Sequence, residues 1–129
     1  MNKESTRLYA VPEGWHTVTP RIVVNDAKQF VAFLKDVFGA SGDYQEERPS
    51  VIRIGDSIIM ISEAGIRSSM TGFLYVYVSD LDATYQRALQ AGASSLEQPS
   101  DTPYGDRRCM VQDKWNNVWQ IATYRPKSN

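Results

Sequence analysis

The sequence holds a single cysteine and a single histidine among its 129 residues. Cys109 has no partner for a disulfide within the chain, which is compatible with a reducing compartment. His16 alone leaves little for a metal site built from several imidazoles or for a nucleophile activated by histidine. We therefore expect a cytoplasmic protein with few of the usual catalytic side chains.

Long apolar runs and an excess of one charge are also missing. No apolar stretch approaches the ~20 residues that a membrane span needs, and the polar start, MNKESTRLYAVPEGW, lacks the apolar centre of a signal peptide. Fourteen basic and fifteen acidic residues give a net charge of −1. Because nucleic acids and anionic membranes attract basic surfaces, we expect neither as a partner.

What the chain does have is an internal repeat. Residues 22–41 (IVVNDAKQFVAFLKDVFGAS) and 76–95 (VYVSDLDATYQRALQAGASS) each predict a strand, a helix cap, an amphipathic helix and a Gly-Ala-Ser end. The cap of the first helix is Asn25 or Asp26, and that of the second is Asp80. A second apolar segment follows each copy, at 50–62 and at 107–123. Two copies of one pattern predict two similar modules that make one structural domain.

Turn signals and composition set the boundaries of these modules. We expect a flexible arm over residues 1–14, a first module over 15–62, a linker over 63–72 and a second module over 73–125. The linker sequence, EAGIRSSMTG, is rich in small residues and has no strong hydrophobic period.

Strands of the first module are indicated by β-branched residues and turns. A strand is expected over 15–24, at a sheet edge or with a bulge because Pro20 has no N–H to donate. A short strand is expected over 44–48. The dipeptide Gly55-Asp56 between two apolar segments indicates a hairpin.

The second module opens on an alternating segment. Phe73, Tyr75 and Tyr77 fall at alternate positions and so share one face of an expected strand. Residues 97–106 are expected to form a loop, followed by two strands that end near residue 124. Aromatic residues with this period serve either as sheet core or as the wall of a pocket.

The repeated unit resembles the vicinal oxygen chelate superfamily, which includes glyoxalase I, bleomycin- and fosfomycin-resistance proteins and extradiol dioxygenases. The resemblance covers about residues 14–124 and is carried by TVTPRIVVNDAKQFVAFLKDVFGAS, VYVSDLDATYQRALQAGA and TPYGDRRCMVQDKWNNVWQIAT. In the PhnB-like branch the last stretch reads close to Y/W-G-D-R, then D-P-F-G-x-x-W. Tyr104 to Arg107, Asp113 and Trp119 match this pattern, and Lys114 to Asn116 depart from its Pro-Phe-Gly centre.

The resemblance implies an α+β fold of two tandem β-α-β-β-β modules. Their curved mixed sheets would form a cup around a small-molecule site, as in the glyoxalase/bleomycin-resistance fold. In this family the cup is often completed across a homodimer interface, so the resemblance also implies a homodimer.

In metal-using members of the family, His and Glu ligands come from the first and fourth strands of each module. The matching positions here hold Thr19, Met60, Phe73 (or Tyr75 in the other register) and Gln120. A hydroxyl, a thioether, an aromatic ring and an amide provide no anionic ligand for a divalent cation. We therefore expect no metal and no other cofactor at these positions.

The residues expected at the cup favour binding over catalysis. Aromatic side chains would stack on a planar molecule, and an inward arginine would fix an anionic group. The expected ligand-binding residues are Thr19, Arg21, Met60, Phe73, Tyr75, Tyr77, Arg108, Trp115 and Gln120. The alternative for Arg108 is an ion pair with Asp106 or Asp113. The leading hypothesis is metal-independent binding or sequestration of a small planar organic molecule, with no catalytic residue.

Two other functions stay open. A metal-dependent lyase or dioxygenase of the glyoxalase type would use a divalent metal at a displaced site that includes His16 and Glu63. A non-catalytic regulatory or assembly subunit would fill the cup with its own side chains. Cys109, in RRCMV, is expected to be a buried apolar residue and not a reactive thiol under each of these hypotheses.

Overall fold

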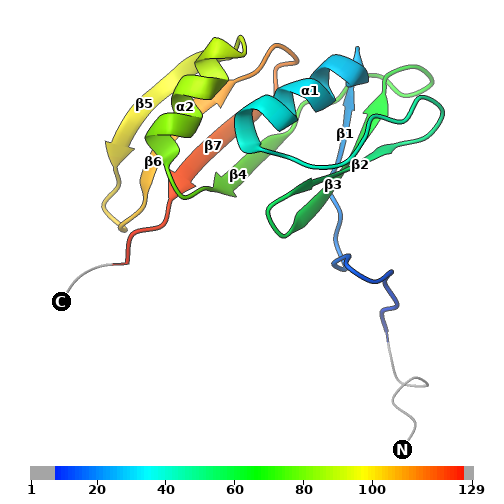
Figure 1. The fold of residues 1–129 in the computed structure, drawn as a ribbon, viewed down its shortest axis with the longest axis horizontal. Coiled ribbons are helices and arrows are strands. Elements are labelled where there is room, and N and C mark those ends of the chain that lie inside the picture. The colour runs from blue at the N-terminus through cyan, green and yellow to red at the C-terminus, as the bar shows by residue number, and fades with distance from the viewer. Residues whose placement is uncertain (1–7, 127–129) are drawn as a thin grey trace, which may run out of the picture.

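The structure, a computed structural model, describes residues 8–126 (Figure 1). Two small sheets each carry one helix. The elements are β1 (Arg21–Val24), α1 (Ala27–Phe38), β2 (Ser50–Ile54), β3 (Ser57–Glu63), β4 (Phe73–Tyr77), α2 (Leu81–Gln90), β5 (Ser94–Asp101), β6 (Arg107–Gln112) and β7 (Val118–Thr123). Within residues 8–126 no helix is long and apolar enough to cross a membrane.

The three strands of the first sheet follow the same order as three of the four strands of the second. The first has the order β1-β3-β2 and the second β4-β7-β6-β5. In each, the strand before the helix pairs in parallel with the last strand of the module, and the remaining pairs are antiparallel. This arrangement of two mixed sheets with their helices confirms the α+β fold class expected from the repeat.

The first strand is shorter than the sequence predicts. β1 begins at Arg21, and residues 15–20 form no strand. Pro20 directly precedes it and takes part only through its carbonyl, which accepts a hydrogen bond from the N–H of Met60 at 3.0 Å. Because β1 is an edge strand of its sheet, a proline at its start is tolerated.

The strand predicted over residues 44–48 is wrong. Pairing at this place is reduced to one bridge, in which Ser41 and Arg53 exchange N–H···O bonds of 3.0 and 2.9 Å. The predicted segment is largely charged and therefore has no apolar face to bury, and Pro49 directly after it has no N–H to continue a ladder. The first sheet therefore has one strand fewer than the second.

The loop predicted over residues 97–106 is wrong in its first half. β5 covers Ser94–Asp101 and pairs with β6, with register shifts on both sides of Glu97. This strand is exposed along almost its whole length at the edge of the sheet. An exposed, irregular edge strand needs no hydrophobic alternation, and for this reason the sequence pattern did not reveal it.

Both helices start and end where their caps predict. The side chain of Asp26 accepts a hydrogen bond from the N–H of Gln29 at 3.3 Å, and Gly39 ends α1 with a φ of 66°. Asp80 caps α2 through the N–H of Ala83 at 3.1 Å. The buried residues of α1 are Ala27, Phe30, Val31, Phe33, Leu34 and Val37.

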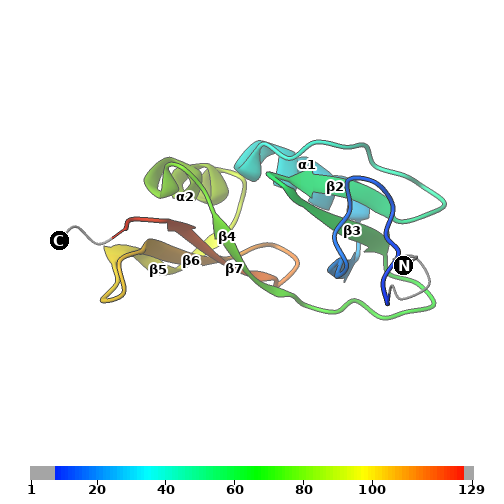
Figure 2. The ribbon, with the colours of Figure 1, turned by 90° about the horizontal axis from the view of Figure 1, so that it is seen from below.

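The core lies between the helices and one face of the sheets. Phe30, Leu34 and Trp119 are among its largest fully buried side chains. α1 and α2 also contact each other, and the guanidinium of Arg87 on α2 donates to the carbonyl of Val37 near the end of α1 at 3.1 Å. Figure 2 shows α2 over one face of the second sheet, whose opposite face carries no helix.

Candidate functional site

The face of the second sheet that carries no helix is rich in aromatic and polar side chains. Register places Tyr75 of β4 beside Gln120 of β7, and Gln120 beside Met110 of β6, so three strands contribute to it. We call this set the aromatic face: Phe73, Tyr75, Tyr77, Arg108, Met110 and Gln120. Phe73 is 69% exposed and Tyr77 60%. The prediction that the three aromatic residues of β4 share a face is confirmed.

A buried carboxylate holds two tyrosines of the aromatic face. The hydroxyl of Tyr75 donates to Oδ2 of Asp106 at 2.8 Å, and the hydroxyl of Tyr77 donates to the same oxygen at 2.9 Å. Asp106 is only 4% exposed. Because one fixed acceptor binds both hydroxyls, the two rings hold defined positions, with centroids 5.3 Å apart and planes at 55°.

A tight turn before β6 sets the position of Asp106. The backbone N–H and the hydroxyl of Thr102 both donate to the carbonyl of Asp106, at 2.8 and 2.7 Å. Gly105 has a φ of 115°, and a Cβ at this residue would lie 2.8 Å from the carbonyl oxygen of Arg125. Only glycine meets both conditions without strain. The Tyr-Gly-Asp-Arg motif thus places a carboxylate under the aromatic face.

Arg108 lies on the aromatic face with partners of its own. Its Nη1 donates to the hydroxyl of Tyr104 at 2.8 Å, and its Nη2 lies 3.6 Å from a carboxylate oxygen of Glu97. The ion pair is therefore with Glu97, and neither aspartate considered in the sequence is its partner. The neighbouring Arg107 points to the other face, where it pairs with Asp82 at 2.9 Å.

The phenol groups of this site resist ionisation. Burial makes the largest contribution to raising the pKa of Tyr75, and hydrogen bonds with Tyr104 and Asp106 raise it further. The hydrogen bond to Asp106 makes the largest contribution to raising the pKa of Tyr77, and burial raises it further. Both hydroxyls are therefore donors at neutral pH, and neither can act there as a general base.

A third tyrosine extends the aromatic wall beyond the sheet. Tyr124 follows the last strand, and its ring lies 6.5 Å from that of Tyr77 with the planes at 82°. Neither Tyr124 nor Asp106 was predicted as a site residue. The Tyr-Gly-Asp-Arg motif was the available signal for Asp106, whereas Tyr124 lies outside any motif.

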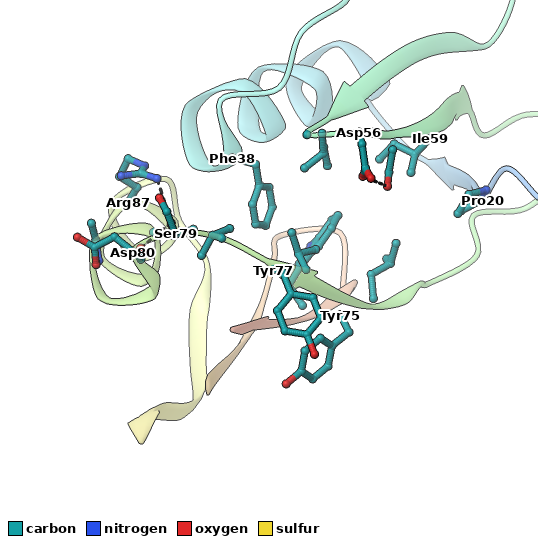
Figure 3. A pocket seen from close by; sticks show the side chains of 18 residues that line it. Pro20, Phe38, Asp56, Ile59, Tyr75, Tyr77, Ser79, Asp80 and Arg87 are labelled. Carbon is teal, nitrogen blue, oxygen red and sulfur yellow. Dashed lines mark hydrogen bonds between the residues drawn. The ribbon is translucent and has the colours of Figure 1, made fainter. Parts of the chain in front are cut away.

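An open cleft of about 710 Å³ lies between the two modules, beside β4 (Figure 3). Its lining includes the hairpin turn at Gly55-Asp56, both sides of β4 and the first turn of α2. Phe38 packs against Trp119 in this lining, with ring centroids 4.9 Å apart. Figure 3 shows Phe38 on one side of β4, and Tyr75 and Tyr77 on the other. The cleft is therefore continuous with the aromatic face around the unpaired edge of β4.

The site residues predicted in the first module lie on the other sheet. Arg21 and Met60 are partners in the β1–β3 register, and Nε of Arg21 donates to the hydroxyl of Ser62 at 2.9 Å. Thr19 precedes β1 and is half-buried. Within this chain these residues are not brought to the aromatic face.

Trp115 is also placed away from the aromatic face. Its ring packs edge-on against Phe30 at 5.0 Å and Phe33 at 5.7 Å, both on α1. Its Nε1 donates to the carbonyl of Asn25 at 2.8 Å. The turn between β6 and β7 directs Trp115 toward the first module, so the structure places the side chain as a link between modules.

Asp113 organises the turn that carries Trp115. Its Oδ2 accepts from Nε1 of Trp119 at 2.8 Å, and its Oδ1 accepts from the N–H groups of Trp115 at 2.8 Å and Asn117 at 3.0 Å. Asn116 takes a φ of 69°, the left-handed conformation that asparagine tolerates in a tight turn. The Asp113…Trp119 motif is therefore structural.

The donors at the family's metal positions do not suit a divalent metal. Tyr75 and Gln120 are neighbours on the second sheet, and Met60 is on the first. A phenol that stays protonated, an amide and a thioether lack the anionic charge that holds such an ion. Among residues 8–126 no group of three or more His, Cys, Asp or Glu side chains could hold a metal.

The two residues of the displaced metal site lie apart in the structure. Glu63 lies opposite Val24 at the end of β1, and its carboxylate accepts hydrogen bonds from the N–H groups of Asp26 and Ala27, both at 2.8 Å. His16 precedes the other end of β1 and is exposed. A four-residue strand is roughly 10 Å long. Glu63 therefore caps the start of α1, and His16 lies beyond the opposite end of β1 from Glu63.

Cys109 is fully buried on β6. Burial raises the pKa of its thiol to about 11. The prediction of a buried apolar residue is confirmed, and the thiol is not a candidate nucleophile.

Comparison with known proteins agrees with the fold. The Glyoxalase/Bleomycin resistance protein/Dioxygenase superfamily model matches residues 15–121. An uncharacterised protein of Mycobacterium bovis is 28% identical over 123 residues, which cover 81% of each chain.

Two solved structures illustrate the likeness of fold. TioX from Micromonospora sp. ML1 has a TM-score of 0.70 at 21% identity, over 88% of this chain and all of that one. FosX from Listeria monocytogenes, complexed with Mn(II) and sulfate ion, has a TM-score of 0.69 at 16% identity, over 84% of this chain and 90% of that one. At these identities the structures show the fold alone, whereas the family model matches most of the sequence. The chain therefore belongs to the glyoxalase/bleomycin resistance protein/dioxygenase superfamily.

Proposed function

We propose that this protein binds a small planar organic molecule against the aromatic face without using a metal. The observation that carries the proposal is the pair of tyrosines held by Asp106, since their rings are exposed yet fixed. Rings that are ordered before a ligand arrives lose little conformational entropy on stacking, which favours affinity.

Exposure of the aromatic face supports a binding role. Phe73 and Tyr77 have most of their surface open to solvent, and so does Tyr104, whose hydroxyl lies 3.5 Å from that of Tyr75. Large apolar groups gathered on one face mark binding sites more often than scattered ones do. In addition, the cleft beside β4 has a volume within the ordinary range of small-molecule pockets.

A second copy of the chain would complete the cup. The aromatic face lacks a cover within residues 8–126, and β4 has an unpaired edge. Arg21 and Met60 lie on the corresponding strands of the first sheet, so a partner's first module can bring this second set of predicted site residues opposite the aromatic face. We propose a homodimer on this basis, and sedimentation of the full chain measures it directly.

Catalysis has little support from the side chains present. Tyr75 and Tyr77 remain protonated, Cys109 is buried, and Glu63 caps a helix. The metal-dependent lyase or dioxygenase would need ligands that these positions do not offer.

We also propose that the chain belongs to the PhnB-like branch of the family. The Tyr-Gly-Asp-Arg motif at residues 104–107 supports this assignment.

Ligand screening of metal-free protein tests the proposal. We expect planar aromatic compounds to raise the melting temperature of protein prepared in chelator, and Tyr77→Ala to remove most of that shift. Tyr9→Ala is the matched control, because Tyr9 is equally exposed but lies in the arm before β1. A shift that appears only after a divalent metal is added, or a panel without any binder, would overturn the proposal.

A further inference from the structure

We propose that the ligand of the aromatic face is an organic cation, such as a quaternary ammonium or protonated amine carried on a planar group. This inference rests on the proposed binding function and deepens it by naming the charge of the ligand. Three features of the site support a cation: the angles between the tyrosine rings, the buried carboxylate behind them and the pairing of the nearby arginine.

The rings are arranged as the walls of a cage. Tyr77 meets Tyr75 at 55° and Tyr124 at 82°, so the three rings turn their faces in different directions. The centroids of Tyr77 and Tyr124 are 6.5 Å apart. One cation can therefore lie within about 6 Å of both centroids, the range over which the negative face of an aromatic ring attracts a positive charge.

Asp106 adds a negative charge behind this cage. It is 4% exposed, and its carboxylate accepts from Tyr75 and Tyr77 but has no ion-pair partner among residues 8–126. A buried carboxylate usually has a cation against it. Here two neutral donors share one of its oxygens and leave its charge uncompensated, so a ligand cation near the rings supplies the missing charge.

The same hydrogen bonds make the rings better partners for a cation. A phenol that donates to a carboxylate is polarised toward the phenolate, which places more electron density in the ring. Tyr75 and Tyr77 share this one carboxylate oxygen. The attraction between a cation and each ring therefore increases without either phenol losing its proton.

Arg108, the arginine of the aromatic face, does not make the site favourable for an anionic ligand. Arg108 donates to Tyr104 at 2.8 Å and lies 3.6 Å from Glu97. Glu97 offsets the charge of Arg108, so Asp106 is the charge in excess at the cluster. An anion stacked on Tyr77 would lie close to the carboxylate of Asp106 and would be repelled.

Three phenols that differ in one substituent test the sign of the ligand's charge. The probes are 4-hydroxyphenyltrimethylammonium, its neutral isostere 4-tert-butylphenol, and the anion 4-hydroxybenzenesulfonate. Calorimetric titration of the full chain measures each affinity. We expect the ammonium to bind about tenfold tighter than the isostere and the sulfonate to bind weakest.

Two substitutions locate the effect. Tyr77→Leu is expected to remove most of the preference for the ammonium while sparing much of the binding of the neutral isostere, and Tyr9→Leu is the matched control. Asp106→Asn is expected to reduce the preference as well, with circular dichroism to establish that the variant is folded. Should Asp106→Asn fail to fold, Tyr77→Leu alone decides.

The outcomes separate this inference from the proposed function. If the neutral isostere binds as tightly as the ammonium, and Tyr77→Leu weakens both equally, the cation inference is wrong and planar binding stands. Preference for the sulfonate, or ammonium binding that Tyr77→Leu leaves unchanged, would also overturn the inference. If neither these probes nor the planar panel binds, the proposed function falls together with it.

Discussion

Tyr77 and Asp106 form a hydrogen bond of 2.9 Å between an exposed ring and a buried carboxylate. The bond joins β4 to the turn before β6, although β7 lies between these strands in the sheet. It determines where the ring lies, and it also holds the proton on the hydroxyl.

Alkaline titration should reveal two tyrosines that ionise late. Seven tyrosines are present, and the pKa values of Tyr75 and Tyr77 are raised above the ordinary value of 10.0. We expect a late component in the absorbance of ionised tyrosine, which becomes smaller in Tyr75→Phe and in Tyr77→Phe. A single transition near the ordinary pKa in the folded protein would contradict this.

The raised pKa values also set the sign of the alkaline stability change. Because the folded state binds these protons more tightly than the unfolded state, the stabilisation is complete below pH 10 and is lost as the pH rises through the folded pKa values. We expect the free energy of unfolding to fall over this alkaline range in the wild type. Tyr75→Phe should show a smaller fall, and urea unfolding at several pH values measures both.

Asp113→Ala should be strongly destabilising. The substitution removes the acceptor of the buried Trp119 indole and of the backbone N–H groups in the turn at 115–117. Leaving such buried donors unpaired costs on the order of 3 kcal/mol. Urea unfolding measures the change. Asp43→Ala is the control, because Asp43 is exposed and its ion pair with Lys35 is long, at 3.9 Å. Equal effects of both substitutions would contradict the role given to Asp113.

Gly105→Ala should perturb the aromatic face from a distance. A Cβ at Gly105 would lie 2.8 Å from the carbonyl oxygen of Arg125, and the φ of 115° disfavours any side chain. We expect a loss of about 2 kcal/mol in stability and weaker binding of planar ligands, since Asp106 is the next residue. Gly65→Ala is the control, because nothing lies within 4 Å of its added Cβ. Unchanged ligand affinity in a folded Gly105→Ala would count against this coupling.

Glu63→Ala should weaken the start of α1. Its carboxylate accepts two N–H groups that the helix itself leaves without a partner, and it lies where negative charge is favourable. We expect a loss of about 1 kcal/mol, partly recovered in Glu63→Gln, with Glu46→Ala as an exposed control. Thermal unfolding with and without chelator measures the loss. If the chelator alone reproduces it in the wild type, the effect of Glu63 is through a metal and not through capping.

Structural features that depend only on nearby residues in the chain were predictable from the sequence. The caps at Asp26 and Asp80, the end of α1 at Gly39 and the alternation of Phe73, Tyr75 and Tyr77 were all predictable. Each depends on neighbours within one helical turn or one strand. The prediction of a cup-forming fold needed more than this, because it came from the resemblance carried by both repeats.

The features that the sequence did not predict depend on contacts between residues far apart in the chain. Trp115 was grouped with the stacking residues, but it lies in a turn whose direction is set by Asp113 and the packing against Phe30. The partnership of Tyr77 with Asp106 depends on strand order, which no local pattern encodes. Likewise β5 has no apolar face, so its sequence predicts a loop where the structure has an exposed edge strand.

The second module holds α1 of the first at both of its ends. Arg87 bonds the carbonyl of Val37 near its C-terminus, and Trp115 bonds the carbonyl of Asn25 just before its N-terminus. A hinge that opened the space between the modules would have to break one of these contacts. The cleft beside β4 therefore has a width set by folding, and we expect ligands to be selected by size at a fixed entrance and not by closure around them.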